Sequence, residues 1–137
     1  MSETLLHASC VAIGDRGVLL AGASGSGKSD LALRLMDRGA TLVSDDYTAL
    51  APRDGRLIAT PPPRIAGSIE MRGVGILTVP HRAEVEVRLI LDLETLPERL
   101  PVFDRRVIAG IALPFAALSA LEPSAPLKVE QLLERFG

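Results

Sequence analysis

One eight-residue segment, residues 22–29 (GASGSGKS), constrains this chain more than any other part of its sequence. It matches the phosphate-binding pattern G-x-x-x-x-G-K-[ST] at every fixed position. A short apolar run, residues 18–21, precedes it, and residues 28–38 carry apolar side chains at helical spacing. A strand, a glycine-rich loop and a helix in this order predict that backbone N–H groups and the helix N-terminus hold the phosphates of a nucleotide.

The residues of this segment have separate predicted roles. Lys28 is expected to reach the outer phosphates, and the Ser29 hydroxyl is expected to coordinate Mg²⁺. The remaining cradle residues are Gly22, Ala23, Ser24, Gly25, Ser26 and Gly27. The alternative, a chance glycine-rich turn before a helix, would arise in roughly one chain of this size in a hundred. We therefore predict a phosphate site here.

The composition is that of a folded soluble domain. With 47% apolar and 23% charged residues, the chain is expected to form a single domain over residues 1–137. A net charge of −2 disfavours nucleic-acid binding, which normally needs a basic face. The longest uncharged stretch, residues 107–121, is too short and too broken to span a membrane. A single cysteine and the lack of a secretory signal pattern indicate a cytoplasmic protein.

The other segments predict an α/β fold. Strands are expected over residues 5–13, 18–21, 41–44, 85–93 and 107–113, a hairpin over 48–51 and 56–59, and an amphipathic helix over 127–136. The order strand, loop, helix, strand around the phosphate segment is a βαβ-like unit.

Two neighbouring acids, Asp45 and Asp46, follow the strand after the predicted phosphate-loop helix. In open α/β sheets the carboxyl edge of the strands holds the ligand. One acid could face the metal and the other the acceptor of a phosphoryl group; the alternative is a pair that caps a turn.

Five further residues are candidates. Glu70 and Arg72 flank one residue and would share a face of a strand, either at the nucleotide site or as an edge-strand salt bridge. His7, taken alone, is more typical of a satisfied core or edge histidine. Arg105 and Arg106 are expected to be solvated charges, with phosphoryl transfer as the alternative.

Together these motifs resemble the catalytic domain of bacterial HPr kinase/phosphorylase. SGSGKSD, LVSDD and IEMRGVGI are similar to that family's motifs, and His7 falls where the family has a histidine. The resemblance covers residues 5 to 93. It implies a phosphoenolpyruvate-carboxykinase-like core with a mixed sheet and a P-loop helix, and often a hexamer.

The resemblance also implies an activity and a set of roles. The chain would be an ATP- and Mg²⁺-dependent kinase of a serine on the phosphocarrier HPr, with a phosphate-dependent reverse reaction, and would regulate a carbohydrate or nitrogen phosphotransferase system. Asp45 would be the acid/base and would work with His7 and Lys28. Ser29, Asp46 and Glu70 would surround the metal, and Arg72 would lie in the signature strand at the nucleotide.

The sequence also departs from that family. It has no room for the family's separate N-terminal domain, and the loop over residues 79–85 is short and lacks the family's arginine. Residues 123–126 (PSAP) stand near the place of a Gly-Arg-Asn element. A nucleotide-binding sensor with little phosphoryl transfer is therefore an alternative, and a small-molecule P-loop kinase is another. A GTPase is disfavoured because the N-K-x-D motif is missing.

Overall fold

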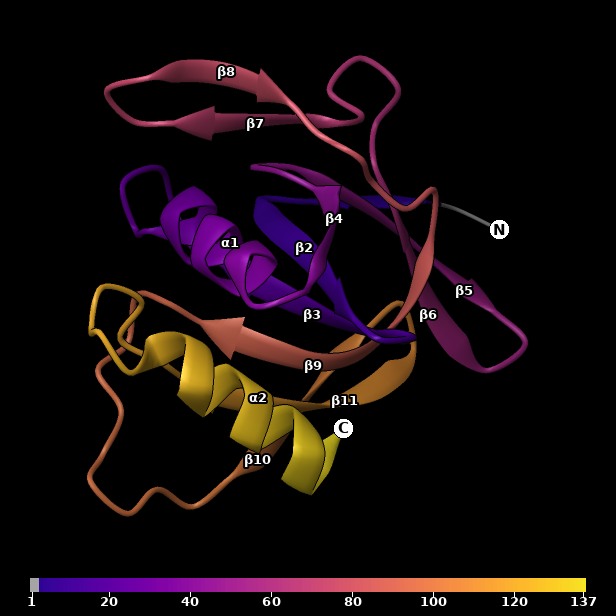
Figure 1. Cartoon of the computed structure of the whole chain (residues 1–137). Helices are drawn as coiled ribbons and strands as arrows, with labels where there is room; N and C mark the ends of the chain where they lie inside the picture. The colour runs from indigo at the N-terminus through magenta and orange to yellow at the C-terminus, as the bar shows by residue number, and fades with distance from the viewer. Residues whose placement is uncertain (1–2) are drawn as a thin grey trace.

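The computed structural model describes residues 3–137, which form an α/β fold around a curled, mixed nine-stranded sheet (Figure 1). The main path through this sheet is β1-β5-β6-β9-β3-β2-β4, and β11 and β10 extend it from β9. Its strands are β1 (Thr4–Leu6), β2 (Ala8–Ile13), β3 (Arg16–Ala21), β4 (Thr41–Ser44), β5 (Thr48–Arg53), β6 (Arg56–Thr60), β9 (Val85–Asp92), β10 (Asp104–Ile108) and β11 (Ile111–Ala117). The pairings β3–β9 and β9–β11 are parallel and the others are antiparallel, so the mixed sheet expected from the sequence is confirmed.

Strand β2 lies between β3 and β4 and is buried on both faces. Because side chains alternate along a strand, Val11 enters one apolar cluster while Cys10 and Ala12 enter the other. The first predicted strand, residues 5–13, is interrupted at His7, which separates β1 from β2. This break leaves His7 at the carboxyl end of β3, beside the start of the glycine-rich segment, where the Gly22 N–H donates to the His7 carbonyl (3.5 Å).

Two helices, α1 (Lys28–Asp37) and α2 (Ala125–Phe136), cover the same face of the sheet. Leu31 and Leu35 of α1 and Val129 and Leu133 of α2 share one apolar cluster with the strands. Ion pairing between Arg38 and Glu130 (2.7 Å) also joins the helices. In Figure 1 the two helices lie next to each other, with α1 nearer to β4 and α2 nearer to β9 and β11.

A separate two-stranded sheet, β7 (Ser68–Met71) and β8 (Gly75–Thr78), forms a hairpin next to α1 (Figure 1). The sequence predicted Glu70 and Arg72 on one face of a single strand. This is wrong, because β7 ends at Met71 and Arg72 belongs to the turn, in which Gly73 has a φ of 84°. Two glycines within three residues favour this reversal.

The predicted strand over residues 107–113 is also wrong in its bounds. The segment contains the end of β10, a tight turn and the start of β11. Ala109 and Gly110 have φ values of 51° and 80°, as a type I′ hairpin turn requires. The turn was missed in the sequence because it lies within an apolar run and a single glycine was its only local signal. Helix α2 begins two residues earlier than expected, with a proline in its first turn.

Candidate active site

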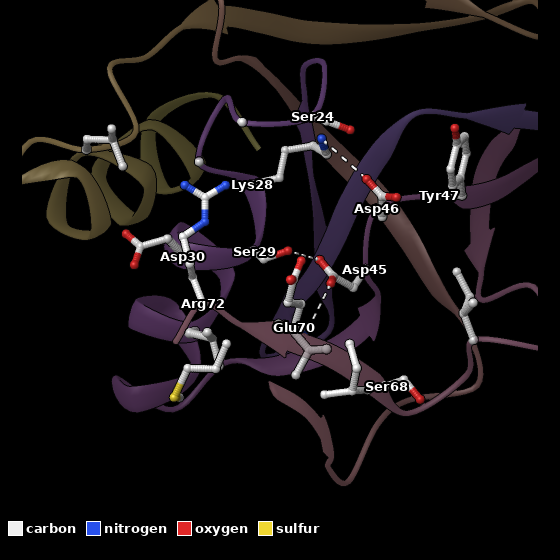
Figure 2. A pocket seen from close by; sticks show the side chains of 18 residues that line it. Ser24, Lys28, Ser29, Asp30, Asp45, Asp46, Tyr47, Ser68, Glu70 and Arg72 are labelled. Atoms are coloured by element: carbon white, nitrogen blue, oxygen red, sulfur yellow. Dashed lines mark hydrogen bonds and ion pairs between the residues drawn. The ribbon is translucent and has the colours of Figure 1, made fainter. Parts of the chain in front are cut away.

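A cavity with a volume of about 590 Å³ opens between the glycine-rich segment, the end of β4 and the β7–β8 hairpin (Figure 2). This size lies within the range of cofactor and ligand sites. Ser24, Lys28, Ser29 and the two acids line it from one side, and Glu70 and Arg72 line it from the hairpin. The structure thus gathers at one cavity the candidates from three segments that are far apart in the sequence.

The glycine-rich segment leads from β3 directly into α1. Gly27 occupies the N-cap with a φ of 96°, and no side chain caps the helix, so the N–H groups of its first turn are available to an anion. A Cβ at Gly27 would lie 3.1 Å from Ala120 and 3.2 Å from Leu121, so both backbone conformation and space require glycine. Local geometry therefore agrees with the predicted phosphate cradle.

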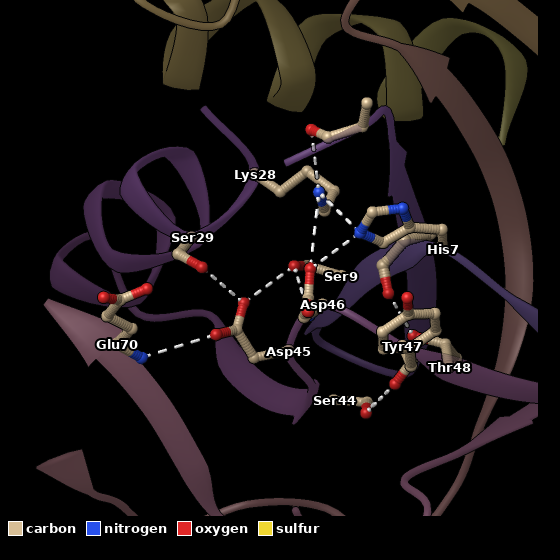
Figure 3. A network of polar contacts seen from close by, with 12 residues as sticks. His7, Ser9, Lys28, Ser29, Ser44, Asp45, Asp46, Tyr47, Thr48 and Glu70 are labelled. Atoms are coloured by element: carbon tan, nitrogen blue, oxygen red, sulfur yellow. Dashed lines mark hydrogen bonds and ion pairs between the residues drawn. The ribbon is translucent and has the colours of Figure 1, made fainter. Parts of the chain in front are cut away.

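Asp45 is 7% exposed and lies at the inner wall of the cavity. Its Oδ1 accepts hydrogen bonds from the hydroxyls of Ser29 (2.7 Å) and Ser9 (2.8 Å), and its Oδ2 accepts from the backbone N–H of Glu70 (3.4 Å) (Figure 3). Three neutral donors satisfy a buried carboxylate and hold it in one orientation. Asp45 is thus fixed beside the hydroxyl that was predicted to coordinate Mg²⁺.

Asp46 has different neighbours. Its Oδ1 lies 2.8 Å from His7 Nε2 and 3.6 Å from Lys28 Nζ, and Lys28 Nζ lies 3.4 Å from His7 Nε2 (Figure 3). His7 Nε2 can donate a hydrogen bond to Asp46 or accept one from Lys28. It cannot do both at the same time, because a ring nitrogen either carries a proton or has a free lone pair. The side chain of Asp46 is 49% exposed, whereas that of Lys28 is 4% exposed. The cluster therefore presents one accessible carboxylate beside a buried cation and an imidazole.

The backbone turns sharply at Asp46, which has a φ of 68°. The Tyr47 N–H donates to the Asp45 carbonyl (2.8 Å), and the Asp46 N–H donates to the Ser9 hydroxyl (3.0 Å). A three-residue turn with positive φ at a non-glycine residue is rare and strained. This turn sends the two neighbouring carboxylates in different directions, one to Ser29 and the other to His7.

The pairing of the two acids is the reverse of the expected one. The residues alone left the roles of the two acids open, and the resemblance grouped Asp45 with His7, and Asp46 with Ser29. In the structure Asp46 contacts His7 and Asp45 contacts Ser29. The strained turn decides the side-chain directions, and nothing in the order of two identical residues could have revealed them.

Glu70 and Arg72 enter the cavity from the hairpin. In Figure 2 the Glu70 side chain points toward Ser29 and Asp45, and that of Arg72 extends toward the start of α1. Both line the same cavity as the glycine-rich segment. Their expected role at a nucleotide stays a prediction, and a turn rather than a shared strand face brings Arg72 to the cavity.

Three residues near the site were missed in the sequence. Ser9 is fully buried and bridges the two acids, and its signal was a polar residue within an apolar strand two positions after His7. Tyr47 stacks on the His7 ring, with centroids 4.7 Å apart. Glu94 accepts a hydrogen bond from the Ala23 N–H (3.1 Å), and nothing in the sequence around it indicated this contact.

The donor set at this wall suits Mg²⁺. Serine and carboxylate oxygens are its preferred ligands, and the ion usually keeps several waters and is completed by substrate phosphates. Ser29 Oγ and Asp45 Oδ1 already lie 2.7 Å apart. Among residues 3–137 the structure contains no group of three or more His, Cys, Asp or Glu residues that would hold a metal on its own. Ser29 and Asp45 therefore offer a cation two oxygen ligands at this wall of the cavity.

Comparison with known proteins agrees with this geometry. Residues 1–107 match the family model described as the HPr Serine kinase C-terminal domain. HPr kinase/phosphorylase of Clostridium botulinum (strain Eklund 17B) is 38% identical over 99 residues, which are 67% of this chain and 33% of that protein. The enzyme of Clostridium tetani is 39% identical over 94 residues, which are 69% of this chain and 30% of the relative.

A solved structure, that of the Hpr(Ser) kinase/phosphatase from Coxiella burnetii, has the same fold. It superposes with a TM-score of 0.84 and 31% identity, covering 96% of this chain and 95% of that one. The chain spans about a third of the length of the curated relatives it matches. Neither helix within residues 3–137 is long and apolar enough to cross a membrane. By its matched residues, its fold and its site, the chain belongs to the HPr serine kinase C-terminal domain family.

Proposed function

We propose that this chain is an ATP- and Mg²⁺-dependent protein-serine kinase whose acceptor is an HPr-type phosphocarrier. One observation carries the proposal: the accessible Asp46 carboxylate lies next to His7 and Lys28, at the mouth of a phosphate-binding loop. Phosphoryl transfer from ATP to a hydroxyl needs a base, a polarising imidazole and a phosphate-binding cation. The family and the names of its relatives support a phosphocarrier as the acceptor.

The contacts support a division of labour between the two acids. Asp45, Ser29 and Glu70 would hold Mg²⁺, which neutralises charge on the outer phosphates when bound. Asp46 would accept the proton of the acceptor serine, and His7 would orient the Asp46 carboxylate. This assigns the acid/base role to Asp46 instead of Asp45, because only Asp46 is both exposed and beside Lys28.

The nucleotide would lie along the glycine-rich loop. The free N–H groups at the start of α1 and the buried Lys28 ammonium would bind the β- and γ-phosphates. Arg72 lines the opposite wall and would add positive charge from the hairpin. The curled mixed sheet supports the expected phosphoenolpyruvate-carboxykinase-like core. The reverse reaction, the regulation of a phosphotransferase system, the cytoplasmic location and the hexamer stay predictions.

Two isosteric variants test the roles of the acids. With labelled ATP, Mg²⁺ and HPr-type carriers, Asp46→Asn is expected to lower serine phosphorylation by about 100-fold or more with little change in Mg·ATP affinity. Asp45→Asn is expected to raise the Mg²⁺ concentration needed for ATP binding. Asp54→Asn, at an exposed hairpin tip, is the matched control and should leave both unchanged.

Each outcome has a clear meaning. If Asp45→Asn abolishes transfer without affecting Mg²⁺, the roles of the acids are those first expected from the resemblance. If the unmodified protein binds Mg·ATP but labels no carrier, the kinase proposal fails and the nucleotide-binding sensor replaces it. If label enters only a small molecule, the small-molecule kinase is correct.

A further inference from the structure

A second cavity, of about 380 Å³, is lined by residues from the C-terminal end of α2 and from strands β10 and β11. Figure 1 shows these three elements close to one another. It shares no lining residue with the cavity at the phosphate loop. Its volume falls within the range of small-molecule sites. Nothing in the kinase reaction proposed above uses it.

Aromatic side chains gather around this cavity. The chain has three phenylalanines and no tryptophan, and all three phenylalanines line this one cavity. Phe103 and Phe136 are in tilted contact with ring centroids 4.6 Å apart. Phe103 is 36% exposed although it is one of the few aromatic residues available for the core. Apolar wall residues Leu89 and Pro114 complete an apolar surface that a flat ring could contact.

One arginine lines the same cavity, and another lies over one of its rings. The first is Arg105. Arg135, on the last turn of α2, lies 5.3 Å from the centre of the Phe136 ring. The guanidinium groups of Arg105 and Arg135 lie more than 4.0 Å from every carboxylate oxygen of residues 3–137, whereas those of Arg38 and Arg53 form ion pairs.

One carboxylate belongs to the cavity wall. Asp104 lines it, and its Oδ1 accepts a hydrogen bond from the backbone N–H of Arg105 (2.7 Å). Asp104 and Arg105 are both exposed, so water screens both charges. Its presence supplies a test, since removal of this charge and removal of the Arg105 charge should change anion binding in opposite directions.

We infer that this cavity binds a small organic anion with an aromatic or apolar body and one acidic group. The ring would lie against Phe103 and Phe136, and the acidic group would reach the Arg105 guanidinium. Arginine suits this task because it pairs with carboxylates and also stacks on rings. The inference is independent of the kinase activity.

The test uses three probes on the ¹⁵N-labelled chain, followed by NMR. Phenylacetate carries both features, phenylacetamide carries the ring without the charge, and acetate carries the charge without the ring. Phenylacetate is expected to shift resonances of β10, β11 and the end of α2 with a Kd of about 1 mM. Phenylacetamide and acetate are expected to bind at least about 5-fold more weakly.

Charge variants sharpen the test. Arg105→Gln should weaken phenylacetate binding by about 5-fold or more, and Asp104→Asn should strengthen it by about 2-fold. Arg56→Gln, on the distant β5–β6 hairpin, is the matched control. Both pocket residues are exposed, so neither variant is expected to unfold the chain.

Three results would overturn the inference. One is equal binding of phenylacetate and phenylacetamide, since the charge would then play no part. Another is shifts confined to residues 22–29, which would place the anion in the phosphate loop. The third is shifts of the cavity residues that depend on protein concentration without any probe, which would make the face a contact between copies of this chain.

Discussion

The ends of β4 and β9 both bring carboxylates to the phosphate loop, but they do so in different surroundings. At the end of β4, Asp45 is buried and held by two hydroxyls and a backbone N–H. At the end of β9, Glu94 is exposed and accepts a hydrogen bond from the Ala23 N–H, at the start of the loop. Asp92, two residues earlier, accepts hydrogen bonds from the Glu94 N–H (2.9 Å) and the Thr95 hydroxyl (2.7 Å).

The difference follows from which part of the loop each strand end meets. The β4 end meets Lys28 and Ser29, where phosphates and metal would lie, so its acids must be held firmly before the ligand arrives. The β9 end meets Ala23, at the outer start of the loop, where a solvated contact is enough. The comparison predicts large effects for changes near β4 and small effects for changes near β9.

The largest effect is expected for Lys28→Met, which keeps the length and apolar stem of the side chain but removes its charge. Lys28 is buried and contacts both His7 and Asp46. Loss of a buried phosphate-binding cation is expected to lower transfer at saturating ATP by about 100-fold or more. Steady-state phosphorylation and calorimetric ATP binding would measure it. An unchanged ATP affinity would contradict the assignment of the phosphate site.

A second, intermediate effect is expected for Ser9→Ala, which removes the hydroxyl that joins the two acids. The Asp46 N–H and one lone pair of Asp45 then lose their partner in a buried place, at a cost of about 1–3 kcal/mol in the free energy of unfolding. Urea unfolding measures it. Thr95→Val removes the corresponding hydroxyl at the end of β9 and should cost less, because Asp92 can bind water instead. Equal losses of stability in the two variants would contradict the proposed difference between the ends of β4 and β9.

A pH-dependent effect is expected at Asp92. Partial burial alone would raise the pKa of Asp92, but hydrogen bonds from Thr95 and Glu94 and the charge of Arg106 outweigh it and lower the pKa. A lowered pKa means that the folded state favours the carboxylate, so this stabilisation is present above the unfolded pKa of about 4 and is lost as the pH falls through the folded value.

The matched variant for this effect is Asp92→Asn. Unfolding of both proteins in urea, measured at several pH values from 7 downward, should show a difference of about 1 kcal/mol at neutral pH that shrinks in acid. A difference that stays constant down to the lowest pH would show that the charge of Asp92 is not its cause.

The smallest effect is expected for Glu94→Gln. The amide oxygen can still accept from the Ala23 N–H, so stability should change by less than about 0.5 kcal/mol. The lost negative charge lies beside a loop that would bind polyphosphate, so ATP should bind slightly more tightly, by about 2-fold at low salt. A loss of ATP affinity would instead show that the Glu94 charge itself is required to shape the loop.

Much of the fold was predictable because its patterns are local. The hairpin β5–β6 was predicted by Asp54 and Gly55 between two apolar runs, and both residues have the positive φ that such a turn needs. The hairpin turn between β10 and β11 was not predicted, since its residues, Ala109 and Gly110, lie within a continuous apolar run. Here the antiparallel pairing of β10 with β11 imposes a conformation that alanine rarely adopts alone.

The sequence predicted which residues lie at the candidate site but not which hydrogen bonds they form with one another. His7, the Asp pair, Glu70 and Arg72 were all identified, and all are found around the phosphate loop. Ser9 and Glu94 were missed because their roles depend on partners 36 and 71 residues away. A sequence pattern carries no information on such distant contacts unless a known motif includes them.

The glycine-rich loop predicted to bind phosphate, and the helix after it, could be located from the sequence alone. Its chemistry needs only glycines that allow unusual φ values, a helix that starts at the right residue, and one lysine, all within eight consecutive positions. The tertiary structure decided which of the two acids meets Ser29 and which meets His7. That choice depends on the strained turn at Asp46 and on Ser9 from β2, because side-chain direction is fixed by contacts with another strand.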